Sequence, residues 1–148
     1  PDRIAIMGGS YGGYTVDWLA VKAPEKFACA ISLVGVSDPD WTNQHSRNQA
    51  FSQGWEREYG PMGSDVVRSV TPIYFAENAI KPILVTAGFN DPRVPPSDPR
   101  RFAYVLEKLG KPVWYHEEVE AGHGLSFKQQ IIRDYTGYYT FMMEHVMK

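Results

Sequence analysis

A short apolar run near the start of the chain passes directly into a cluster of glycines, and this junction restricts the fold more than any other feature. The run covers Arg3 to Met7 (RIAIM) and continues into GGSYGG. From Tyr14 to Val21 the pattern becomes helical, until Pro24 stops it. The sequence therefore predicts a buried strand, a tight turn and a helix, in that order.

The rest of the chain repeats this alternation of strands and helices. We predict further strands at 28–34, 82–87 and 113–119, further helices at 64–70, 98–109 and 127–146, a helical turn at 72–77, and an irregular or short-helical excursion at 41–61. Strands that alternate with helices favour an α/β fold, here a mostly parallel sheet of about four strands with helices on both faces. The strand at 113–119 is more polar and is expected near a sheet edge.

Apolar spacing predicts which faces of the last two helices are packed. The helix over 98–109 is expected to begin after Ser97 as N-cap and to pack through Phe102, Val105, Leu106 and Leu109. The helix over 127–146 is expected to pack through Ile131, Tyr135, Tyr138, Met142 and Val146.

Charge and composition limit the possible partners. The 148 residues carry a net charge of -2, which gives no basic surface for nucleic acid or anionic lipid, so we expect a small molecule or a peptide. No apolar run approaches the roughly 18–20 residues that a membrane span needs. The single cysteine, Cys29, excludes an intrachain disulfide and a cysteine zinc cluster, and we expect an inert buried thiol.

No metal or cofactor site is expected. The histidines and carboxylates show no H-E-x-x-H or similar spacing, and the glycine cluster lacks the G-K-[ST] of a phosphate loop.

The glycine cluster contains a candidate nucleophile. Gly8 to Gly12 (GGSYG) fits the G-x-S-x-G of a nucleophile elbow, between a strand and a helix. We expect Ser10 to hold a strained backbone, with Gly8 and Gly12 placed where a Cβ would collide with neighbouring chain. The Tyr11 backbone N–H would face a developing oxyanion. An ordinary glycine-rich turn is the alternative for this motif alone.

A serine needs a base within hydrogen-bond reach, and His123 is the best candidate of the four histidines. It lies in AGHG, directly after the fourth predicted strand. His116 is inside a strand and His145 is on the terminal helix, so we expect structural or solvated roles for both. His45 is expected to be a polar residue of the 41–61 excursion.

The base needs a carboxylate to orient it, and Asp91 follows the third predicted strand in NDPRVPP. Taken alone, Asp91 could be a turn residue before proline. Asp98 is expected in the first turn of a helix, and Glu117, Glu118 and Glu120 are expected to be exposed along a strand. The order Ser10, Asp91, His123, each after a successive strand, predicts a catalytic triad at the carboxyl edge of the sheet.

The whole chain resembles the C-terminal half of the hydrolase domain of the prolyl oligopeptidase family, especially its acylaminoacyl-peptidase and dipeptidyl-peptidase-like branches. The matching stretches are GGSYGGY, SVTPIYFAENAIKPILVTAG, NDPRVPPSDPRRFAYVLEKLGKP and EAGHG. The resemblance implies a partial α/β-hydrolase fold. It also implies peptidase or esterase activity on short peptides or acylated amino acids, through an acyl-enzyme.

The same resemblance implies that residues 1–148 are the C-terminal portion of a longer domain. Family members carry an N-terminal β-propeller and earlier hydrolase strands, and an upstream loop supplies a second oxyanion donor. We therefore expect this chain alone to hydrolyse substrates poorly. We also expect it to form a homo-oligomer, in which the strand over Arg3 to Met7 pairs with its symmetry mate.

Two other functions stay open at this stage. The same triad would serve a carboxylesterase or thioesterase, and a hydrolase-like fold could instead act as a non-catalytic assembly module.

Overall fold

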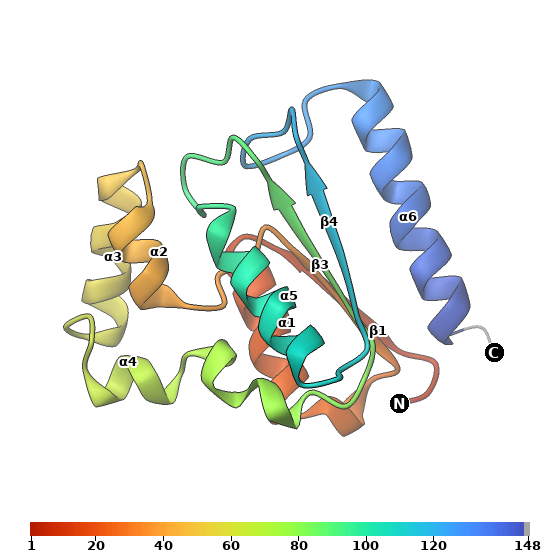
Figure 1. Cartoon of the computed structure of the whole chain (residues 1–148), viewed down its shortest axis with the longest axis horizontal. Helices are drawn as coiled ribbons and strands as arrows, with labels where there is room; N and C mark the ends of the chain where they lie inside the picture. Colours follow the sequence, from red (N-terminus) through yellow and green to blue (C-terminus); the bar gives the residue numbers. More distant parts are fainter. Residues whose placement is uncertain (147–148) are drawn as a thin grey trace.

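A four-stranded parallel sheet forms the centre of the structure, a computed structural model in which residues 1–146 are described, apart from the side chains of Gln49, Phe51 and Ser52 (Figure 1). The strands follow the order β1-β2-β3-β4, and each neighbouring pair is parallel. They are β1 (Ala5–Gly9), β2 (Cys29–Leu33), β3 (Ile83–Gly88) and β4 (Val113–Glu118). The predicted α/β class and the parallel sheet are confirmed.

Helices cover both faces of the sheet (Figure 1). They are α1 (Tyr11–Lys22), η1 (Pro24–Lys26), α2 (Pro39–His45), α3 (Gln49–Tyr59), α4 (Asp65–Ser69), η2 (Pro72–Asn78), α5 (Ser97–Lys108) and α6 (Lys128–Val146). One face carries α1, η2 and α5, which share a buried apolar cluster with Ala30, Ile83 and Val85. The other face carries α6.

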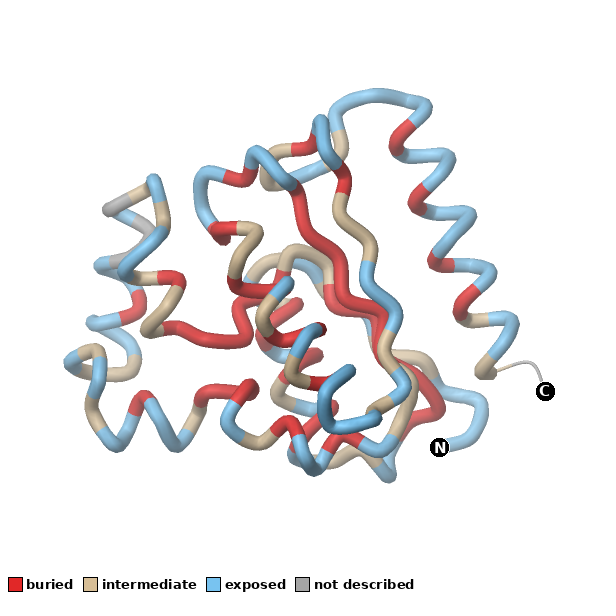
Figure 2. The backbone as a smooth tube through the Cα atoms, in the orientation of Figure 1, coloured by how far each residue is buried: buried red, intermediate tan, exposed pale blue. Residues whose placement is uncertain are grey.

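Alternation along the strands explains the two layers. In β2, Ala30 faces the α1 and α5 side, whereas Cys29 and Ile31 face α6, where they contact Tyr138 and Phe141. The strands lie between largely exposed outer helix surfaces (Figure 2). Cys29 is fully buried and free, in agreement with an inert core thiol. The more polar β4 lies at a sheet edge, as expected.

The first strand and helix are displaced from their predicted bounds. Pairing with β2 runs from Ala5 to Gly9, so Arg3 lies before the strand and two glycines extend it. The helix begins at Tyr11 and thus includes Gly12 and Gly13. A Cβ on Gly13 would lie 2.6 Å from Gly35 Cα, so this glycine lets α1 approach the end of β2.

The excursion at 41–61 forms α2 and α3, to one side of the sheet (Figure 1). Asp38 caps α2 by accepting a hydrogen bond from Trp41 N at 3.1 Å. Trp55 of α3 is buried against Tyr14, Val36 and Val94, which anchors this helix to α1.

Ser97 is not the cap of α5. The helix begins at Ser97 itself, with Pro96 as N-cap, and the Ser97 hydroxyl accepts a hydrogen bond from Trp41 Nε1 at 2.9 Å. A partner on α2 thus takes the oxygen that a capping role would use. Leu109 lies past the helix end and is 46% exposed, so it does not belong to the packed face.

The packed face of α6 also differs from the prediction. Its buried residues are Gln130, Asp134, Tyr138 and Phe141, whereas Ile131 and Tyr135 are exposed. In the first half of α6 the buried residues are polar, and Asp134 contacts His116 of β4. Apolar spacing could not predict buried positions that polar residues occupy. No described helix is long and apolar enough to cross a membrane.

Candidate active site

Three strand ends carry the predicted triad. Ser10 directly follows β1, Asp91 lies three residues after β3, and His123 lies five residues after β4. Because the strands are parallel, all three residues reach the same carboxyl edge of the sheet.

The turn at Ser10 has the strained backbone expected of an elbow. Ser10 holds φ 58° and ψ −119°, a region that side chains with a Cβ rarely adopt, and its N–H donates to Leu33 O at 2.9 Å. A Cβ on Gly8 would lie 2.4 Å from Gly12 O, so glycine is required there. The expectation that a Cβ would also collide at Gly12 is wrong, because a Cβ there would meet nothing within 4 Å in the described part of the chain. The Gly12 backbone lies beside the Cβ position of Gly8, so only a side chain on Gly8 would collide.

The three side chains form a continuous hydrogen-bonded relay. His123 Nε2 lies 2.8 Å from Ser10 Oγ, and His123 Nδ1 lies 2.7 Å from Asp91 Oδ2. With the proton on Nδ1, the imidazole donates to Asp91 and accepts from the Ser10 hydroxyl. The second carboxylate oxygen, Asp91 Oδ1, accepts from the N–H groups of Arg93 at 2.8 Å and Val94 at 3.1 Å. Asp91 is 1% exposed, so it has both the burial and the partners of an orienting anion.

The loops that carry Asp91 and His123 are held together by backbone contacts. Asn90 N donates to Ala121 O at 2.9 Å, and Asn90 Nδ2 donates to Val119 O at 3.0 Å. A Cβ on Gly88 would lie only 2.0 Å from Gly122 O. A glycine at the end of β3 therefore allows the His123 loop to approach the Asp91 loop.

A cavity of about 640 Å³ opens beside this relay. Ser10 and His123 line it together with glycine backbone, and its apolar walls come from Leu33, Val34, Leu125, Ile131, Tyr135 and Tyr138. The volume suits a small ligand or a segment of peptide.

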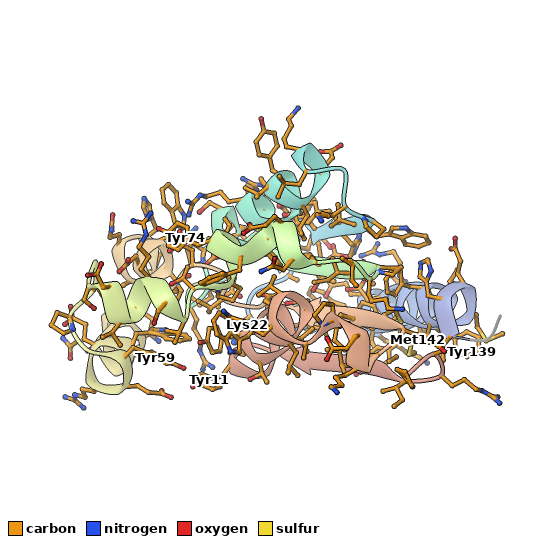
Figure 3. The ribbon with its side chains drawn as sticks, turned by 90° about the horizontal axis from the view of Figure 1, so that it is seen from below. Tyr11, Lys22, Tyr59, Tyr74, Tyr139 and Met142 are labelled. Carbon is orange, nitrogen blue, oxygen red and sulfur yellow. The ribbon has the colours of Figure 1, made fainter. Side chains whose placement is uncertain are left out.

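The predicted oxyanion donor has a suitable position. Tyr11 is the first residue of α1, so its N–H has no acceptor within the helix. Its side chain points to α3, where the hydroxyl contacts Glu58 and the hydroxyl of Tyr59 (Figure 3). Burial and the neighbouring Glu58 raise the pKa of the Tyr11 hydroxyl, which stays a proton donor at neutral pH.

The other carboxylates have different surroundings. Asp98 is fully buried and accepts hydrogen bonds from Ser37 N at 3.0 Å and from the Ser37 and Thr42 hydroxyls. Burial raises the pKa of Asp98 to about 6. Glu117 pairs with Arg100 at 2.8 Å. Glu118 is 7% exposed, so the expectation that alternation exposes it is wrong: α6 covers that face of β4.

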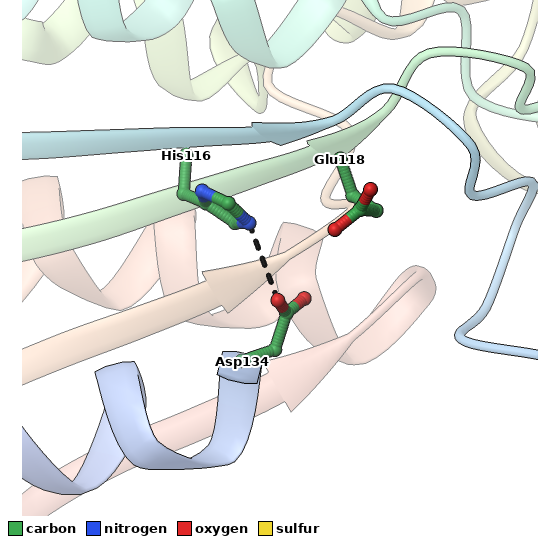
Figure 4. Close-up of side chains that lie close together, drawn as sticks. All are labelled: His116, Glu118 and Asp134. Carbon is green, nitrogen blue, oxygen red and sulfur yellow. Dashed lines mark ion pairs between the residues drawn. The ribbon is translucent and has the colours of Figure 1, made fainter. Parts of the chain in front are cut away.

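The remaining histidines lie away from Ser10. His45 Nδ1 lies 2.9 Å from Trp41 O, within α2. His116 Nε2 lies 3.2 Å from Asp134 Oδ1, and with Glu118 these residues form a cluster that joins β4 to α6 (Figure 4). Sequence spacing did not reveal this cluster, because its members come from two elements that meet only in the folded chain.

The chain is similar to known proteins over nearly all of its length. The Prolyl oligopeptidase family model matches residues 1–148. The chain is 33% identical, over 96% of its length, to "Dipeptidyl peptidase family member 6" of Caenorhabditis elegans. Its structure is similar to a puromycin-hydrolyzing peptidase of Mycobacterium tuberculosis (TM-score 0.93, 28% identity, 99% of this chain) and to Pyrococcus horikoshii acylaminoacyl peptidase (TM-score 0.90, 26% identity, 99% of this chain).

The similarity covers a limited part of each relative. The chain spans 20% of the length of the nematode protein, 22% of the mycobacterial chain and 25% of the Pyrococcus chain. Within that part, both the family pattern and the fold extend over nearly all of the residues given. The chain belongs to the prolyl oligopeptidase family.

Proposed function

We propose that this chain is the catalytic part of a serine peptidase, with Ser10 as nucleophile, His123 as general base and Asp91 as orienting acid. The relay from Ser10 Oγ through His123 to Asp91, with contacts of 2.8 and 2.7 Å, is the observation that carries the proposal. The peptidase relatives in the same family support it.

The reaction follows from these positions. Ser10 Oγ attacks the substrate carbonyl carbon while its proton passes to His123 Nε2. Asp91 stabilises the resulting imidazolium through Nδ1–H. When the tetrahedral intermediate collapses, His123 gives the proton to the leaving amine and an acyl-enzyme remains on Ser10. Water, activated by His123, then releases the acid and restores the serine.

The Tyr11 N–H is proposed to stabilise the oxyanion of the tetrahedral intermediate, helped by its place at the start of α1. The family resemblance implies a second donor, from a loop upstream of these residues. Removal of one such donor lowers the rate by about 10²–10³-fold. We therefore propose that the 148 residues alone carry an activated serine but turn over substrates slowly.

Short peptides and acylated amino acids are the proposed substrates. An acylaminoacyl peptidase that is 26% identical to this chain was solved in complex with Z-Gly-Gly-Phe-chloromethyl ketone, a peptide inhibitor. The apolar walls of the cavity would also accept the acyl group of an ester, so a carboxylesterase or thioesterase is the second candidate. Rates on aminoacyl-nitroanilides and on short acyl esters, measured side by side, would distinguish the two activities.

Labelling with a fluorophosphonate probe tests the activated serine without requiring turnover. We expect a covalent adduct on Ser10 that Ser10→Ala abolishes and that His123→Ala slows strongly. Ser126→Ala is the matched control, since Ser126 is an exposed serine near His123, and it should label as the wild type does. Equal labelling of wild type and Ser10→Ala would refute the proposal.

Self-association through the first strand is a separate part of the proposal. Among the described strands β1 lies at one edge of the sheet, and Ile4 and Met7 are each 51% exposed there. A second copy related by two-fold symmetry could pair with this edge. Sedimentation at micromolar concentration should show a dimer, and a strictly monomeric protein would contradict this part.

A further inference from the structure

A histidine and two carboxylates that the proposed mechanism does not use converge between β4 and α6 (Figure 4). His116 and Glu118 are two residues apart in β4, so both side chains lie on the same face of the sheet. Asp134 comes from α6, which packs against that face. One ligand atom from each of the three lies within 4.8 Å of the other two.

This spacing is close to that of a metal site. Zn²⁺ holds nitrogen and oxygen ligands at about 2.0–2.2 Å, which places tetrahedral ligands roughly 3.4 Å apart. His116 Nε2 and Asp134 Oδ1, at 3.2 Å, already have this separation. The three ligand atoms lie within 4.8 Å of one another, so the Glu118 oxygen needs to move by at most about 1.4 Å to reach the same separation.

The carboxylate oxygens that face the cluster are held by ion pairs and not by hydrogen bonds from the described residues. Asp134 is 5% exposed, yet its Oδ1 accepts no hydrogen bond from any described residue, and Glu118 Oε2 accepts none either. Their neighbours there are the His116 imidazole for Asp134 and the Arg133 guanidinium for both carboxylates. Two buried anions side by side are costly without a cation.

The Arg133 guanidinium is the cation beside these carboxylates, and a metal ion could take its place. Its guanidinium contacts Glu118 Oε2, and its Nε lies 3.7 Å from Asp134 Oδ1. The Arg133 side chain is 58% exposed, so it can turn into solvent and leave both carboxylates to another cation.

Access to the cluster comes from the cavity beside Ser10. Glu118 and Asp134 line that cavity of about 640 Å³ together with Ser10 and His123. Three protein ligands with an open position toward a cavity are the arrangement of zinc sites that also bind a water or a small ligand. Because imidazole combined with carboxylates favours Zn²⁺ over Mg²⁺, the preferred ion is a transition metal.

We propose that His116, Glu118 and Asp134 form a binding site for a divalent transition metal of the Zn²⁺ type, with Arg133 as the competing cation when the metal is absent. Such an ion would lie in the wall of the cavity that contains Ser10. This proposal does not depend on the proposed catalytic role of Ser10, and its test needs no turnover.

Titration of the purified, metal-free protein with Co²⁺, followed by competition with Zn²⁺, tests the proposal. Bound Co²⁺ should develop visible absorption bands that Zn²⁺ abolishes and Mg²⁺ leaves unchanged. Zn²⁺ at about 100 times its Kd should raise Tm by roughly 5–10 °C. His116→Gln and Glu118→Gln should each weaken the affinity by more than the about 10–100-fold that loss of an outer-shell partner costs.

Two further variants complete the design. His45→Gln is the matched control, because His45 lies on α2, away from α6, and it should bind as the wild type does. Arg133→Gln should tighten binding by about two- to fivefold, since a partly exposed ion pair no longer competes. Absence of Co²⁺ bands in the wild type, or unchanged affinity in both the His116→Gln and Glu118→Gln variants, would overturn the assignment.

Discussion

Replacement of Gly88 by alanine should disrupt the relay without touching any of its three residues. A Cβ on Gly88 would lie 2.0 Å from Gly122 O, whereas ordinary contact begins at 3.4 Å. The two groups must therefore separate by about 1.4 Å, following the contact distances in the structure. Gly88 does not have a positive φ, so alanine can adopt its backbone conformation and only the lack of space is tested.

The displacement should fall on the His123 loop. Gly88 ends a strand that is buried at every position and paired on both sides, whereas Gly122 belongs to a loop. His123 follows Gly122 directly, and its contacts of 2.8 Å to Ser10 and 2.7 Å to Asp91 cannot both survive a shift of this size. A misplacement of about 1 Å can cost about 10²-fold in rate, and we expect a loss of at least this size.

The assay is the rate of fluorophosphonate labelling of Ser10, measured together with a thermal melt. Gly124→Ala is the matched control, because Gly124 flanks His123 on its other side and a Cβ there would meet nothing within 4 Å among the described residues. The control should label within about twofold of wild type, since open positions tolerate small substitutions. A Gly88→Ala protein that melts cooperatively and labels at the wild-type rate would refute the argument from the close approach of the two loops.

Two further predictions concern stability. Burial raises the pKa of Asp98 from an ordinary 3.8 to about 6, so the folded protein binds the carboxyl proton more tightly than the unfolded chain does. The protonated carboxyl therefore adds about 3 kcal/mol to the free energy of unfolding below pH 3.8, and this contribution is lost as the pH rises through 6. In urea unfolding between pH 3.5 and 7, the free energy of unfolding of the wild type should fall by about 3 kcal/mol relative to that of Asp98→Asn as the pH rises, because only the wild type loses this contribution. A difference between the two proteins that does not change with pH, or that changes in the opposite direction, would contradict the prediction. Phe141→Ala should cost about 3–5 kcal/mol, because Phe141 is fully buried against Ile31 and Leu84. Tyr139→Ala, at a neighbouring position that is 61% exposed, should change stability by about 0.5 kcal/mol or less, and equal losses would show that α6 is packed differently.

Local sequence was sufficient for the alternation of strands and helices and for the three residues of the relay, but it left open whether the segment at 41–61 is irregular or helical. A strand that ends in glycines around a serine has few backbone conformations, and Ser10 adopts the expected one at φ 58°. Asp91 and His123 could be selected because each follows a predicted strand, and parallel strands bring their carboxyl ends to one edge. Their proton-sharing distances agree with the predicted triad, whose catalytic role stays a prediction.

Residues whose environment depends on a distant element were not predictable in this way. The local sequence predicts Ser97 as a helix cap, but its hydroxyl accepts a hydrogen bond from Trp41 on α2. Alternation along β4 predicts that Glu118 is exposed, but α6 covers it. The predicted packed face of α6 was itself wrong, because Asp134 takes a buried position that apolar spacing assigns to its neighbours.

The sequence by itself determined the parallel α/β architecture, the elbow at Ser10 and the choice of Asp91 and His123, because each depends on short-range conformational limits and on the order of strands. Only the tertiary structure decided how α6 lies on the sheet, and with it the cavity and the cluster of His116, Glu118 and Asp134. The physical reason is that the rotation of a packed helix about its axis depends on all the contacts it makes with residues far away in the chain, and no local pattern contains those contacts.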